Sequence, residues 1–116
     1  MADQVEIYLP RTRINERSQV IATARFRTIA DAAASTPTTV HYKLSDLTSE
    51  EVIRDWTSVS AAAEVSVTLT AADNKINDNS KPMQRMELLV VADKGLATES
   101  VGRKSYQVRN VYGRRD

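Results

Sequence analysis

The stretch from residue 63 to residue 93, AEVSVTLTAADNKINDNSKPMQRMELLVVAD, decides the fold class. Its first part, residues 64–70, alternates apolar with polar side chains, which is the pattern of a strand with the core on one face and water on the other. Its last part, residues 88–91, is apolar on both faces, as in a central strand covered on both sides. The stretch therefore predicts two strands that differ in burial, joined by the polar connection 71–81.

That polar connection has three interpretations: a metal loop, a disordered linker, or the segment by which the chain crosses between two sheets. It contains side chains of the kind that bind calcium, namely Asp73, Asn74, Asn77, Asp78 and Asn79. It lacks the central glycine and the terminal glutamate of a calcium-binding hand loop, and two carboxylates are too few for tight binding. We therefore expect a metal-free crossing in which Ile76 fills the bottom of the core.

Five further segments show strand patterns of β-branched and aromatic residues between turn residues. They are residues 3–9, 20–27, 40–44, 52–56 and 97–108. The segment 52–56 can also be read as part of a short amphipathic helix that opens at Thr48 or Ser49, but Val52-Ile53 favours a strand. Gly95 is expected to have a positive φ in a three-residue hairpin, and Gly102 is expected to form a bulge.

Seven short strands without a long helix predict an all-β fold, an antiparallel seven-stranded sandwich of immunoglobulin-like or fibronectin type III-like topology. The whole chain, residues 1–116, is expected to form one domain, with an arginine-rich loop at 10–18 and a short tail at 111–116. The expected core consists of Val20, Ala22, Phe26, Val40, Tyr42, Val65, Val67, Leu69, Leu88 and Val90.

Composition limits the function classes. The chain has no cysteine, which excludes disulfides, thiolate zinc sites and thiol nucleophiles. Its 16 basic and 15 acidic residues give a net charge of +1, which argues against a dedicated nucleic-acid binder. Neither a signal peptide nor a membrane-spanning run is visible, so we expect neither export nor a membrane partner.

Two side chains that occur once in the chain are candidate sites. His41 is the only histidine, and no Gly-x-Ser-x-Gly elbow accompanies it, so a solvated surface histidine is favoured over a small hydrolase. Trp56 is the only tryptophan, and a core anchor is favoured over an exposed platform for sugars. An exposed aromatic group would instead favour a glycan-binding or adhesin-type module.

Arginines cluster near both ends of the chain. Arg25 and Arg27 form a solvent-facing basic pair on one strand, whereas the arginines of PRTRINER and VYGRRD lie in segments with few apolar groups. Such segments need a neighbouring surface to offset the entropy of ordering, and arginine suits protein interfaces. The expected partner interface is Arg11, Arg13 and Arg17 in the loop, with Tyr112, Arg114 and Arg115 in the tail.

The order of TVHYKLSDLTSEEVIRDWTSV, AEVSVTLTAADNKI, MELLVVADKGLATES and RKSYQVRN resembles the small immunoglobulin-like or fibronectin type III-like proteins of tailed-bacteriophage virions. The resemblance covers residues 36–111. It implies a non-enzymatic virion protein, without cofactors, that serves in capsid decoration, head-to-tail joining or as a tail accessory. Its implied partners are capsid or tail subunits or copies of itself, and it would assemble in the host cytoplasm.

Overall fold

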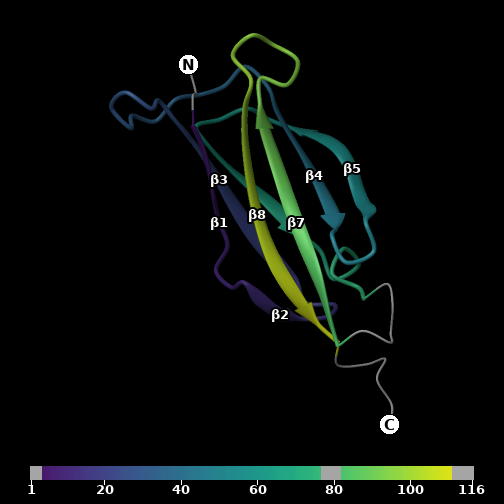
Figure 1. The fold of residues 1–116 in the computed structure, drawn as a ribbon. Coiled ribbons are helices and arrows are strands. Elements are labelled where there is room, and N and C mark those ends of the chain that lie inside the picture. Colours follow the sequence, from purple (N-terminus) through teal and green to yellow (C-terminus); the bar gives the residue numbers. More distant parts are fainter. Residues whose placement is uncertain (1–3, 77–81, 111–116) are drawn as a thin grey trace.

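The computed structural model describes residues 4–76 and 82–110, which form two sheets that face each other in a β-sandwich-like arrangement (Figure 1). All the regular elements of these residues are strands, as the sequence predicts. They are β1 (Gln4–Tyr8), β2 (Arg13–Asn15), β3 (Val20–Arg27), β4 (Val40–Asp46), β5 (Glu51–Val59), β6 (Glu64–Leu69), β7 (Met83–Ala92) and β8 (Ser100–Arg109). The described part of the chain contains no helix with the length and apolar character that crossing a membrane requires.

The smaller sheet has three antiparallel strands in the order β1-β3-β6. Alternate residues of β3 are buried, and the residues between them face water. On that outer face Arg25 Nε lies 3.0 Å from Glu64 Oε1 of β6, and Arg27 Nε lies 2.9 Å from Glu6 Oε1 of β1. The two arginines are thus not a free basic pair, because each is neutralised across the sheet.

The larger sheet has five strands in the order β2-β8-β7-β4-β5. β7 is central, as its apolar sequence predicts, and pairs antiparallel with both β8 and β4. β2 pairs in parallel with β8, so the prediction of seven strands, all antiparallel, is wrong by one strand and one pairing direction. β2 has only three residues, and Ile14 is the only apolar one. The sequence therefore cannot show the alternation of apolar and polar side chains that marks a strand.

The core lies between the sheets and contains all ten residues expected there. It also contains Ile14, which places β2 over one end of the sandwich, and Ile76, which is buried as predicted. Trp56 is not part of it: the side chain is 36% exposed on β5, so its assignment to the core is wrong. β5 forms the edge of its sheet, and its register shifts against β4 between Tyr42 and Ser45.

The two glycines behave differently from each other. Gly95 has a φ of 82°, as predicted, although it lies in a loop, 93–99, that is longer than the three-residue hairpin expected. Gly102 is not a bulge, because β7 and β8 pair without interruption past it. A Cβ on Gly102 would lie 2.8 Å from the carbonyl oxygen of Val5, so the glycine is needed where β1 crosses β8.

Candidate protein interface

The polar connection after β6 turns its first two polar side chains into the protein. Asp73 Oδ2 accepts hydrogen bonds from Arg54 Nη2 at 2.5 Å and from the backbone amide of Thr70 at 2.9 Å. Arg54 also donates to the hydroxyl of Tyr42 at 2.7 Å. The Asp73 carboxylate is therefore occupied by an internal ion pair, and residues 4–76 and 82–110 contain no group of three potential metal ligands. Asn77, Asp78 and Asn79 lie outside the described residues.

Asn74 links this connection to the turn between β2 and β3. Its side chain accepts a hydrogen bond from the Tyr106 hydroxyl at 2.6 Å and donates to the carbonyl oxygen of Ser18 at 2.7 Å. Its carbonyl oxygen accepts from the backbone amide of Arg17 at 2.9 Å. Burial raises the pKa of the Tyr106 hydroxyl, which therefore stays protonated and acts as the donor. Asp73 and Asn74 thus form hydrogen bonds inside the protein at this end of the sandwich.

Residues 12–17, part of the loop expected at 10–18, are held by the domain itself. The amide of Gln107 donates to the carbonyl oxygen of Thr12 at 2.8 Å, and the amide of Glu16 donates to that of Arg109 at 2.9 Å. Ile14 is buried in the core. Within the domain, β8 therefore supplies backbone partners to these residues and the core supplies the apolar contact.

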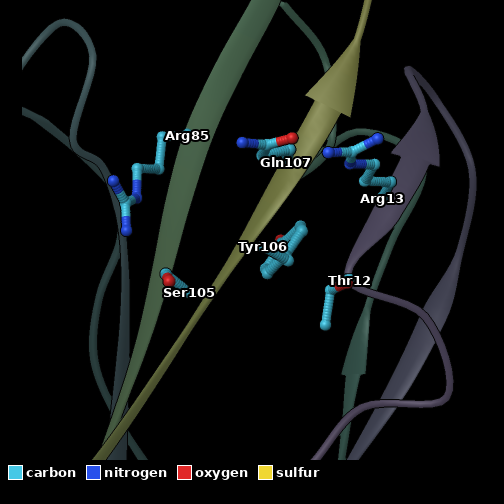
Figure 2. A pocket seen from close by; sticks show the side chains of 6 residues that line it. All are labelled: Thr12, Arg13, Arg85, Ser105, Tyr106 and Gln107. Carbon is cyan, nitrogen blue, oxygen red and sulfur yellow. The ribbon is translucent and has the colours of Figure 1, made fainter.

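Pairing with β8 places Arg13 in a row of side chains that runs across three strands. Arg13 of β2 is the register partner of Gln107 of β8, and Gln107 is the partner of Arg85 of β7. Figure 2 shows Gln107 between the two arginines on one face of the sheet. The same residues, together with Thr12, Ser105 and Tyr106, line a hollow of about 280 Å³.

The charges of this row lack internal partners. Within the described residues neither Arg13 nor Arg85 forms an ion pair, and Gln107 Oε1 is buried without a hydrogen-bond partner. A guanidinium offers a planar set of N–H donors that matches a carboxylate. The arrangement can therefore bind an acidic group of another molecule on a rigid sheet face.

Sequence patterns indicate only one of the two arginines in this row, Arg13. Arg85 is the third residue of the apolar strand β7 and shows no local signal of a site, because only the registers of β7 and β2 against β8 bring it near Arg13. Arg11 and Arg17 lie on either side of β2 and are exposed. Arg11 lines a second hollow, of about 510 Å³, with Ile14, Val20 and other residues around the β2–β3 turn. Tyr112, Arg114 and Arg115 lie outside the described residues.

Trp56 forms a second feature of the larger sheet. The ammonium group of Lys94 lies 4.7 Å from the centre of its ring, and that of Lys43 lies 5.6 Å away. Both distances are in the range of cation–π contacts. His41 is half-buried on β4, and its Nδ1 atom has no hydrogen-bond partner among the described residues.

These features define the surface but assign it no family. Comparison with protein families, with curated proteins and with solved structures finds no match to this chain.

Proposed function

We propose that this chain is a non-enzymatic structural or accessory protein of a bacteriophage particle, which acts through protein contacts. The observation that carries the proposal is the row formed by Arg13, Gln107 and Arg85, where two guanidinium groups have no acidic partner in the described residues. The arginines of β3 and β5 form ion pairs within the domain, whereas Arg13 and Arg85 form none with the described residues, so the row is a charged surface that the fold does not use itself.

A strand-held arginine row favours contact with a protein. Both backbones are fixed by the sheet, so binding restricts only the two side chains. Arginine can donate two hydrogen bonds to one carboxylate while its stem packs on apolar surface. Surface ion pairs are individually weak, worth about 0–1 kcal/mol each, which suits a subunit whose attachment is multiplied by many copies in a particle.

The strand order supports the finer assignment of the fold. The order β1-β3-β6 opposite β8-β7-β4-β5 is typical of fibronectin type III-like sandwiches, and an added strand such as β2 beside the last strand is typical of immunoglobulin-like ones. The virion setting itself rests on the sequence resemblance. On that resemblance, the protein assembles in the host cytoplasm together with its virion partners.

The proposal is tested on native particles. Antibodies against the purified protein should label particles from the source culture at regular positions in immunogold electron microscopy. The antibody adsorbed with purified protein is the control and should give no label. Finding the protein only outside particles, with bare particles in the same preparation, would refute the virion role.

The second candidate function is a glycan-binding or adhesin-type module, and exposed Trp56 favours it. An indole ring offers a flat face for sugar stacking, and Lys43 and Lys94 would favour an acidic sugar. Because Trp56 is the only tryptophan, its fluorescence reports directly on this surface. In titrations with a sialylated and a matched neutral oligosaccharide, the emission should change at a lower concentration of the sialylated sugar. No change with either sugar at millimolar concentration would dismiss this candidate.

A further inference from the structure

The larger sheet ends in two strands that each have one free edge. β2 pairs only with β8, and β5 pairs only with β4, so the two strands lie at opposite ends of the same five-stranded sheet (Figure 1). A free edge presents backbone N–H and C=O groups that another strand can pair with. The side chains along each edge therefore decide what approaches it.

The two edges carry opposite charges. We call residues Arg11, Arg13 and Arg17, around β2, the basic edge, and residues Glu50, Glu51 and Asp55, along β5, the acidic edge. All six side chains are exposed, and none forms an ion pair within the described part of the chain. The remaining charged residue of β5, Arg54, points back to Asp73 and does not offset the acidic edge.

The strand directions make the two edges compatible. β2 runs parallel to β8, and three successive antiparallel pairings, from β8 to β7, β4 and β5, make β5 run opposite to β2. When two copies lie side by side in the same orientation, β5 of one and β2 of the next are therefore antiparallel. This is the pairing direction with the straighter hydrogen bonds.

The charges also lie at similar heights along the strands. Glu51 is linked through its register partners Asp46 and Met86 to Tyr106, whereas Arg13 is the partner of Gln107. Glu51 and Arg13 therefore lie at positions along the strands that differ by one residue. Charges that served only to keep free edges apart would have the same sign on both edges, and here the signs are opposite.

We propose that the occupant of the basic edge is the acidic edge of a second copy of this chain. The copies associate head to tail, β5 of one beside β2 of the next, in a heterologous contact that closes into a ring or continues as a row according to the rotation between copies. This inference rests on the proposed virion role and names one partner that the protein would have in the particle, a second copy of itself.

Two double variants with opposite charge changes test the contact. The variant Arg11→Glu with Arg13→Glu makes both edges acidic, and the variant Glu50→Lys with Glu51→Lys makes both edges basic. Each alone should associate at least about tenfold more weakly than the unmodified protein in sedimentation equilibrium at low salt. Mixed in equal amounts they should associate again, because each altered edge then meets an edge of opposite charge.

The control is Arg103→Glu, which reverses a charge on β8, a strand that lies between the two edge strands of the larger sheet. It should associate like the unmodified protein. All variants should keep their thermal unfolding temperatures, since the exchanged side chains make no ion pair within the described residues, apart from the 3.8 Å contact between Arg103 and Glu87.

Failure of the mixture to associate would overturn the inference, and so would loss of association in the control. A protein that stays monomeric in every sample at millimolar concentration would overturn it as well. If antibodies still label particles in that case, the virion role stands and the partner of the basic edge is a different virion protein. If labelling also fails, both proposals fall.

Discussion

The buried hydrogen bond between Tyr106 and Asn74 gives the sharpest test of how the polar connection stabilises the domain. Tyr106 is 2% exposed and Asn74 is fully buried, and the hydroxyl donates to Asn74 Oδ1 at 2.6 Å. Replacement of Tyr106 by Phe leaves this oxygen without a donor in a place that water does not reach. A buried acceptor that loses its partner costs ~1–3 kcal/mol.

Tyr42→Phe is the matched control. It removes the same atom, but the hydroxyl of Tyr42 accepts a hydrogen bond from Arg54, which keeps its contact with Asp73 and is about one third exposed. The guanidinium that loses its partner can therefore turn to water, and we expect a loss below about 1 kcal/mol. The two variants differ in the burial of the group left behind.

Urea unfolding followed by fluorescence of Trp56 measures both losses. For a domain of this size, 1 kcal/mol corresponds to roughly 4 °C in melting temperature, so Tyr106→Phe should melt ~4–12 °C lower. The variant Asn74→Ala should lose more, because it also leaves the carbonyl oxygen of Ser18 without its donor. In the Asn74→Ala background, Tyr106→Phe should cost almost nothing, since the hydroxyl no longer has its acceptor.

Equal losses for Tyr106→Phe and Tyr42→Phe would refute this reasoning, because burial of the group left behind would then not matter. A loss below about 0.5 kcal/mol for Tyr106→Phe would mean that the bond to Asn74 contributes little. Additive losses in the double variant would show that the two side chains act independently.

Three further predictions concern the core, a strand crossing and pH. Phe26→Ala should destabilise the domain by ~3–5 kcal/mol because Phe26 is fully buried. The control Ile29→Ala, at an exposed site, should change the free energy of unfolding by no more than about 0.5 kcal/mol. Similar losses for the two variants in urea unfolding would contradict the register of β3. Gly102→Ala should cost ~1–3 kcal/mol and speed hydrogen exchange of β1 amides, because the added Cβ meets the backbone of Val5. A variant as stable as the unmodified protein would instead favour the bulge expected from the sequence. The hydrogen bond from Thr98, with those from the Thr38 and Thr39 amides, lowers the pKa of Asp93 below its ordinary 3.8, so its stabilising effect is full above about pH 4 and is lost as the pH falls through the folded-state pKa. The difference in melting temperature between the unmodified protein and Asp93→Asn should therefore shrink on acidification below pH 4, and a constant difference would contradict the assignment.

Local patterns in the sequence determined most of the architecture. Alternation with a period of two depends only on neighbouring residues, so it placed β3, β4 and β6 and all ten expected core residues. The apolar run of β7 identified the central strand, because only a strand covered on both faces tolerates such composition. The polar connection was recognised as a crossing, with Ile76 in the core.

Tertiary structure decided the features that depend on distant parts of the chain. β2 is too short to show an alternation of apolar and polar residues. It exists as a strand because β8 offers it backbone partners. Trp56 is exposed because β5 lies at a sheet edge, which its composition does not reveal. The pairing of β7 with β8 brings Arg85 to Gln107 and Arg13, and the strand order places the basic and acidic edges at opposite ends of one sheet. Register and strand order are global properties, because each depends on which distant segments pair, and for this reason the candidate interface could be read only from the folded chain.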